Sequence, residues 1–422
     1  MKTMPFSTYQ KILIALIAFV QFSVVLDFMV MSPLGDMLMK SLSITPTQFG
    51  FAVSAYAFSA GISGFLAAGF ADRFDRKKML LFFYSGFIFG TLLCGLANSY
   101  AMLVTARIVT GLFGGVMSSI SLAIISDIFV IEQRGRVMGF TQMGFGASQV
   151  LGIPVSLYLA NLSGWQSPFL MIVAMSMVIA LLIWVNMRPI TAHLAVQHSQ
   201  SAYAHLRYTL THPHYRLGFA ATALLSVGGF MIMPFSSAFA INNLHVTPQQ
   251  LPFLFMVSGI SGIIFMPLVG RLSDKMDKFK LFAIASLFTM VAILIYAHLV
   301  PMPLWVIILV NILIMLGIMG RMVPAMALTT AVPEMKDCGA FMSITSSLQQ
   351  IAGGVASSIA GMIVVQKNSF SPLEHYDILG WIIAVVSLLC IFLVYRVNQH
   401  VQRKLDKKAA AMGEISERLV NA

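Results

Sequence analysis

Long apolar stretches alternate with short polar intervals along almost the whole chain. Each apolar stretch holds about 20–30 residues, enough for a helix that crosses a hydrocarbon layer of ~30 Å with some tilt. The pattern predicts twelve membrane-spanning helices, at 11–35, 48–70, 79–98, 101–130, 137–160, 167–187, 217–242, 249–270, 280–299, 303–331, 338–365 and 377–397.

A charged block occurs twice, at an offset of 202 residues, in polar intervals before the third and the ninth predicted helices. Residues 72–78 have the sequence Asp-Arg-Phe-Asp-Arg-Lys-Lys, and residues 274–280 have the sequence Asp-Lys-Met-Asp-Lys-Phe-Lys. The same offset relates Gly152 to Gly354. The repeat indicates two related halves, an arrangement that many transporters have, with a binding site between the halves.

We therefore expect an all-α membrane protein made of two pseudo-symmetric six-helix bundles. The bundles would occupy 1–187 and 217–398, joined by a polar linker at 188–216 and followed by a tail at 399–422. The linker holds five histidines, but their irregular spacing favours a solvated connection over a metal site. The tail mixes Lys, Arg, Glu and Ala, which is typical of a short helix on anionic lipid or of a solubilising segment.

Composition supports a membrane protein and excludes several other classes. Apolar residues make up 58% of the chain and charged residues 10%, against about 25% charged in soluble domains. The net charge of +11 does not indicate nucleic-acid binding, because 22 of the 26 Lys and Arg residues fall on one side of the predicted helices. The positive-inside rule then predicts a multi-pass protein of the bacterial inner membrane with both termini in the cytoplasm.

Catalytic and metal-binding patterns are missing from the sequence. The three cysteines, Cys94, Cys338 and Cys390, are isolated and match neither a metal site nor a disulfide framework. No acid, histidine and nucleophile occur together within the predicted helices. We expect no enzyme activity, no metal and no cofactor.

The first charged block resembles the loop signature of the major facilitator superfamily, Gly-x-Leu-x-Asp-Arg-x-Gly-Arg-Lys/Arg, and most closely that of its drug:proton antiporter-type branch of bacterial efflux proteins. Residues 68–77 retain the acid and three bases but depart from the signature at Ala68, Phe70 and Asp75. The second copy restores the Gly and Leu, at 270–274. The resemblance implies alternating access, a small-molecule substrate and a monomer.

The resemblance also implies a gating cluster. Asp72 would face the exposed N–H groups at the start of the eleventh helix, and Arg76 would pair with an acid at the inner end of the fourth. Asp127 is the only acid suitably placed there, and its counterpart in the second half is Thr329, so the second cluster should be weaker. The alternative is a loop that is merely basic. The predicted gating residues are Asp72, Arg73, Arg76, Asp127, Asp274 and Lys278.

Two ionisable residues lie within predicted helices of the first half, where an unpaired charge is costly. At a rise of ~1.5 Å per residue, Asp27 and Arg107 fall at nearly the same depth, which allows a buried pair. Burial favours the neutral form of a carboxylic acid, whereas a guanidinium favours the charged form. A pair that changes with conformation would therefore couple transport to protons. The alternatives are a permanent structural pair and an Asp27 close to outer water.

The fifth predicted helix partly resembles a Gly/Pro-rich element of antiporters in this superfamily. Its Gly-Pro step is Ile153-Pro154, and Pro154 removes a backbone donor, which loosens a helix. The partial match leaves export and import both open. Polar or adaptable residues in the helices suit a substrate cavity, although helix packing is the alternative for each; the candidates are Arg321, Met31, Gln142, Gln149 and Gln349.

The sequence thus predicts a secondary active transporter, with proton-coupled efflux of a small amphipathic organic compound as the first hypothesis. Proton-coupled uptake of a metabolite or nutrient is the second. A non-transporting membrane receptor or scaffold is a minor third, which would not require the repeated charged block. The expected partners are the substrate, protons and the lipid bilayer.

Overall fold

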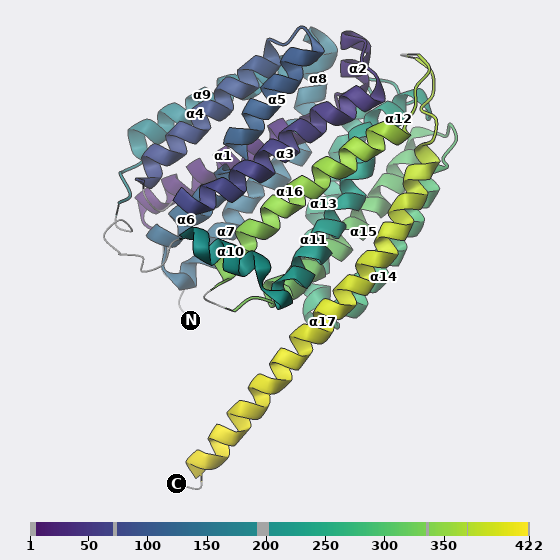
Figure 1. Cartoon of the computed structure of the whole chain (residues 1–422). Coiled ribbons are helices and arrows are strands. Elements are labelled where there is room, and N and C mark those ends of the chain that lie inside the picture. Colours follow the sequence, from purple (N-terminus) through teal and green to yellow (C-terminus); the bar gives the residue numbers. More distant parts are fainter. Residues whose placement is uncertain (1–5, 71–73, 192–201, 335–336, 369, 421–422) are drawn as a thin grey trace.

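The computed structural model describes residues 6–70, 74–191, 202–334, 337–368 and 370–420. Its helices stand side by side in two bundles (Figure 1). The first bundle consists of α1 (Thr8–Val30), α2 (Gly35–Leu42), α3 (Pro46–Phe70), α4 (Arg76–Gly95), α5 (Tyr100–Gly114), α6 (Met117–Ile128), α7 (Ile131–Ala147), η2 (Ser148–Gly152), α8 (Ile153–Ser163) and α9 (Ser167–Asn186). The second consists of α11 (Pro213–Ile232), η4 (Met233–Phe235), α12 (Ser236–Asn242), α13 (Leu251–Lys275), α14 (Lys278–Ala297), α15 (Leu304–Thr330), α16 (Cys338–Ile363) and α17 (Tyr376–Val420).

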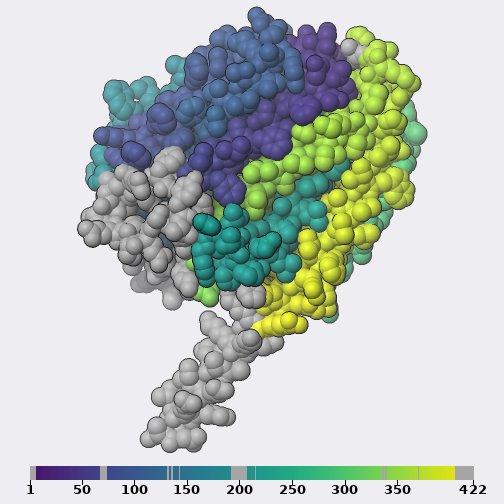
Figure 2. All heavy atoms as spheres, viewed as in Figure 1, coloured from purple at the N-terminus to yellow at the C-terminus, as the bar shows by residue number. Residues whose placement is uncertain are grey.

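The two described ends of the chain lie at the same end of the bundle, which we call the terminal face (Figure 1). The opposite end, which holds α2 and α12, is the distal face. Between the faces, α3 of the first bundle runs alongside α16 of the second. Figure 2 shows them as adjacent purple and lime bands across the visible surface.

Eleven helical segments of the described chain are long and apolar enough to cross a membrane. The remaining expected span, 338–365, corresponds to α16, which has 26 residues and so a length of ~39 Å. This helix is rich in Ser, Gly and Gln, which lowers its hydropathy. Because α16 packs against α3 and α11, its polar side chains do not need to face lipid.

The repeated charged block caps one helix in each bundle. The Asp75 side chain accepts a hydrogen bond from the Lys77 backbone at 2.9 Å and begins α4. At the same position of the repeat, Asp277 accepts from the Lys280 backbone at 2.8 Å and begins α14. An N-terminal Asp satisfies backbone donors that the helix itself cannot. Capping thus explains why Asp stands where the family signature has Gly.

Close contact between α3 and α16 depends on glycine. A Cβ atom on Gly50 would lie 2.8 Å from the Ser357 carbonyl oxygen, and one on Gly361 would lie 2.9 Å from the Pro46 carbonyl oxygen. Neither neighbour can move without moving its helix. Gly residues therefore let the two bundles touch through their backbones.

The fifth predicted span is irregular at the position where the sequence indicated a loosened helix. The π-helical turn η2 ends at Gly152, two residues before Pro154, which stands in the first turn of α8. Proline lacks the N–H that the preceding turn would bind, so the hydrogen-bond ladder shifts there. The break lies beside α13 of the second bundle.

Helix occurs in both the described linker and the described tail. Part of the linker forms a helix, α10 (Ala202–Thr211), that contacts both α3 and α16 at the terminal face (Figure 1). The described linker therefore touches both bundles, while most of the described side chains of α10 remain exposed. The backbone of the tail continues the last membrane helix to Val420 without a break.

Candidate functional site

A buried ion pair lies inside the first bundle. Nη1 of Arg107, on α5, is 2.8 Å from Oδ2 of Asp27, on α1, and both side chains are 0% exposed. Thr91, on α4, donates its hydroxyl to Oδ1 of Asp27 at 3.1 Å. The structure thus brings together the two residues that were expected at one depth, and each carboxylate oxygen has a donor.

Tyr56, on α3, separates the ion pair from the space between the bundles. The guanidinium carbon of Arg107 lies 4.5 Å from the centre of the Tyr56 ring, a cation–π contact. Nε and Nη2 of Arg107 have no hydrogen-bond partner among the described residues. The aromatic ring therefore covers a guanidinium that retains unused donors.

Tyr56 also lines a cavity between the two bundles. The cavity holds about 100 Å³, and none of the described residues that line it is charged; they are Gln21, Val24, Val25, Phe28, Tyr56, Ala60, Gly114, Gly115, Ser118, Ser346, Ser347 and Gln350. First-bundle helices supply most of this lining, and α16 supplies the rest. The ion pair and the cavity are thus neighbours across a single ring.

The five residues expected to line the substrate cavity are not among these lining residues. Met31 is buried in the core beyond the end of α1. Gln149 lies at the contact between η2 and α13, where its carbonyl is 3.0 Å from the position of a Cβ on Gly259. Gln349 lies in α16 next to the cavity-lining Gln350. Gln142 lies in α7, and its side chain is outside the described part of the structure.

Arg321 is buried within the second bundle. It lies on α15, is 5% exposed, and makes no ion pair with the described residues. Nε and Nη2 also have no hydrogen-bond partner there. Its nearest described surroundings include Gly228 on α11, whose Cβ position lies 3.9 Å from Nη1. Arg321 is thus a buried cation set apart from the cavity lining.

At the terminal face, Arg76 pairs with the acid that was expected for it. Nε of Arg76 lies 2.9 Å from Oδ2 of Asp127, which ties the start of α4 to the end of α6. In the second bundle, Asp274 and Lys278 are exposed and make no ion pair with the described residues. Asp72 and Arg73 lie outside the described residues.

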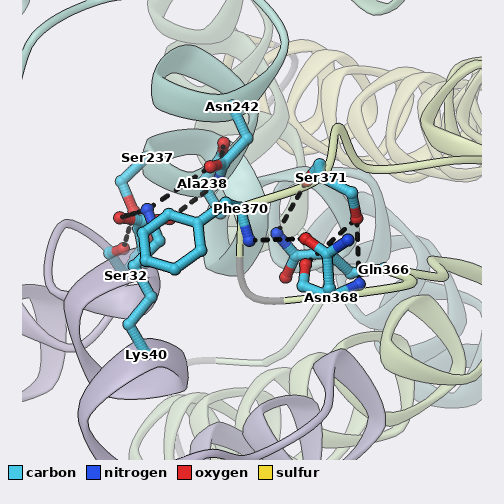
Figure 3. A network of polar contacts seen from close by, with 10 residues as sticks. Ser32, Lys40, Ser237, Ala238, Asn242, Gln366, Asn368, Phe370 and Ser371 are labelled. Atoms are coloured by element: carbon cyan, nitrogen blue, oxygen red, sulfur yellow. Dashed lines mark hydrogen bonds and ion pairs between the residues drawn. The ribbon is translucent and has the colours of Figure 1, made fainter.

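The distal face holds a polar network between the bundles that the sequence analysis missed (Figure 3). Asn242, on α12, donates to Oδ1 of Asp36, on α2, at 2.6 Å. Lys40 binds the other carboxylate oxygen at 2.8 Å, and its ammonium lies 5.0 Å from the Phe370 ring centre. Ser237 donates to the backbone carbonyl of Ser32 at 2.7 Å. These contacts close the distal face.

The missed residues carried little signal in the sequence. Tyr56 and Thr91 are uncharged residues in apolar helices. Neither their charge nor a repeating pattern of polar positions along the helix distinguishes them from their neighbours. Asp36 and Lys40 are charged but lie near a predicted helix end, where charges are ordinary. The 202-residue offset between the two halves offered one clue to this network, since Lys40 and Asn242 are separated by the same 202 residues.

These observations define a membrane protein with two related helical bundles and a cavity between them. The family model described as Major Facilitator Superfamily matches residues 17–357 and 218–418. The chain belongs to this superfamily and has its transporter fold.

Curated relatives are transporters with different described roles. The chain is 29% identical over 264 residues to the uncharacterised MFS-type transporter YceJ of Bacillus subtilis (strain 168), covering 62% of this chain and 66% of YceJ. It is 23% identical to a probable sugar efflux transporter of Helicobacter pylori (strain G27), over 61% of this chain and 64% of that protein. These matches thus span just under two thirds of each relative. Multidrug resistance protein 2 of Bacillus subtilis (strain 168) is 21% identical over 58% of this chain and 63% of that protein.

Solved structures confirm the fold. A bacterial homologue of the human lysosomal transporter Spinster, in an inward-facing and unoccupied conformation, matches with a TM-score of 0.76 at 13% identity, over 94% of this chain and 99% of that one. A D-xylose–proton symporter matches with a TM-score of 0.75 at 16% identity, over 92% of this chain and 98% of that one. At these identities the likeness concerns the architecture alone.

Proposed function

We propose that the protein is a proton-coupled exporter of a small amphipathic organic compound, working by alternating access as a monomer in the bacterial inner membrane. The observation that carries the proposal is the Asp27–Arg107 pair, fully buried and separated by Tyr56 from the cavity. Ionisable groups inside a membrane protein commonly belong to ion or proton pathways. The distribution of basic residues supports an orientation with the terminal face in the cytoplasm.

The carboxyl group of Asp27 would carry the proton. As a carboxylate it accepts from Arg107 and Thr91. A proton taken from the distal side onto Oδ2 would remove the charge that holds the guanidinium, so Arg107 and the Tyr56 ring would shift. Re-forming the pair would release that proton to the terminal side. The state of the ion pair would thus alter the cavity wall.

The substrate class follows from the cavity lining. Its walls combine aromatic and aliphatic side chains with serine hydroxyls and glutamine amides, and the lining includes no charge. Such a surface suits a compound with an apolar body and a few hydrogen-bonding groups. The names of the sugar efflux and multidrug relatives are compatible with export of such a compound.

Opening and closing would alternate between the two faces. The distal network closes one side in this structure, and the Arg76–Asp127 pair would belong to the gate on the other. Asp274 and Lys278 would contribute less to that gate, because Thr329 replaces the acid in the second bundle. Gating by Asp72 and Arg73 is part of the same proposal.

The test is proton movement in sealed proteoliposomes with the pH dye pyranine inside. Each member of a panel of drugs and monosaccharides is added in turn, with and without an imposed pH gradient. We expect at least one amphipathic compound to cause proton flux, and to be moved uphill when the pH gradient alone supplies energy. Opposite directions of proton and compound indicate exchange, whereas the same direction would establish the uptake symporter instead.

Two variants separate the mechanism from general damage. Asp27→Asn should abolish uphill movement and proton flux while preserving gradient-free exchange of the active compound, since the amide still accepts a hydrogen bond from Arg107. Asp377→Asn, at an exposed acid near the start of α17, is the matched control and should behave as the wild type. Uphill transport by the Asp27→Asn protein would refute the proposed proton carrier.

A further inference from the structure

A second apolar space lies on the outside of the first bundle, between α1 and α7. It is a groove of about 550 Å³, lined by residues from Phe6 to Phe22 and from Phe140 to Ala147. Helix α1 separates the groove from the central cavity, because Gln21 and Phe28 on another face of α1 line that cavity. The groove is thus a distinct site.

Small residues form the floor of the groove and large ones form its walls. A Cβ atom on Gly144 would lie 2.5 Å from the Ala18 carbonyl oxygen, so α1 and α7 touch there. Phe19 and Met143 stand beside this contact and are 53% and 65% exposed. Both helices belong to candidate membrane spans, so lipid is the surrounding medium. An acyl chain suits this geometry.

Among the described residues, positive charge stands at the terminal-face end of the groove. Lys11 lies one turn into α1, is exposed, and makes no ion pair with the described residues. Arg136, on α7, stacks on the Phe6 ring at 3.9 Å from its centre. From Lys11 to Phe22 the helix rises ~16 Å, which leads from the membrane surface into the hydrocarbon layer.

We propose that this groove binds one anionic phospholipid of the terminal-face leaflet, with its phosphate beside Lys11 and an acyl chain along Phe19 and Phe22. A net negative headgroup complements the Lys11 ammonium that lines the groove, whereas a zwitterionic headgroup brings its own cation to the same place. The bound lipid restrains α1, which carries Asp27, against α7, which leads into η2. The proposal does not depend on the proposed transport function.

The first experiment measures thermal unfolding of the purified full chain in detergent. Phosphatidylglycerol should raise the unfolding midpoint above the value with phosphatidylcholine of the same acyl chains, because binding to the native state stabilises it. Lys11→Gln should remove most of that difference, since losing one surface lysine weakens anionic-lipid binding about fivefold. Lys280→Gln, at an exposed lysine of α14 outside the groove, should retain it. Equal effects of both lipids, or equal loss in both variants, would overturn the proposal.

A second measurement locates the acyl chain. Tryptophan introduced by Phe19→Trp should be quenched more strongly by brominated phosphatidylglycerol than by brominated phosphatidylcholine at equal mole fraction. Phe82→Trp, at an exposed position of α4, should respond equally to both and serves as the control. Equal quenching of the Phe19→Trp protein by the two lipids would show ordinary bulk lipid in the groove and refute a specific site.

Discussion

The two partners of the buried ion pair respond differently when one of them is removed. Asp27 can lose its charge by binding a proton, whereas the Arg107 guanidinium stays charged at any accessible pH. A lone Arg107 would therefore remain a buried cation, held by the Tyr56 ring and by the backbone carbonyl of residue 27 without any counter-charge from the acid. The stability of the first bundle should depend more on keeping the acid than on keeping the base.

We expect Asp27→Leu to lower the free energy of unfolding by about 3–5 kcal/mol, the usual cost of breaking a buried pair from one side. Arg107→Met should lower the free energy of unfolding by less, since Asp27 can then become neutral by binding a proton. The double variant should recover much of the loss, because it buries no charge. Denaturant unfolding of all three proteins in detergent measures these differences, and strictly additive losses would argue against the coupling.

Depth along each helix was accessible from the sequence, but rotation about the helix axis was not. Residue counting brought Asp27 and Arg107 to one level, and the structure places them in contact. Helices α1 and α3 are apolar all round, so no apolar stripe indicates which side faces the bundle interior. For the same reason Tyr56 and Thr91 could not be assigned to the ion pair.

Among the helices, α3 and α16 set how closely the two bundles can meet. The packing partner of a glycine could not be predicted from the sequence, because a small residue permits close contact with any neighbouring helix. The structure shows that Gly50 and Gly361 face one another across the bundle interface. The size of the side chains at positions 50 and 361 should therefore control closure of the distal face.

We expect Gly50→Val to weaken distal closure, because its side chain would overlap the Ser357 carbonyl oxygen. The readout is labelling of a Ser237→Cys protein by a membrane-impermeant maleimide, since Ser237 is fully buried in the closed face. Labelling should be faster in the Gly50→Val background. Gly270→Val is the control, because nothing described lies within 4 Å of its Cβ position. If the labelling rate of Ser237→Cys is unchanged in both the Gly50→Val and the Gly270→Val proteins, the α3–α16 contact does not govern closure of the distal face.

For the whole molecule, the fold and the conformation differ in how far the sequence determines them. The repeated block and the apolar pattern predicted two six-helix bundles, and the family match and solved structures confirm that fold. Which face is closed could not be predicted, because the proposed alternating access requires one sequence to stabilise both arrangements to similar degrees. The distal contacts of Ser32, Asp36 and Asn242 became evident only from the structure.

If the distal face must open during each cycle, a covalent link across it should stop transport. The hydroxyl oxygens of Ser32 and Ser236 are 3.4 Å apart and belong to different bundles. Oxidation of a Ser32→Cys/Ser236→Cys protein should abolish the compound-dependent pyranine signal in proteoliposomes, and a reductant should restore it. Ser32→Cys alone should be insensitive to the oxidant. Full activity of the cross-linked protein would contradict alternating access at this face.

The last helix offers a way to watch the second bundle from outside the membrane. Helix α17 has 45 residues, and its backbone projects from the terminal face as one straight rod (Figure 1). Its length is ~67 Å, so a tilt of about 10° in that bundle would carry the tip through about 12 Å. If the bundle rotates as proposed, the tail would act as a lever that converts a small internal rotation into a displacement large enough for fluorescence energy transfer.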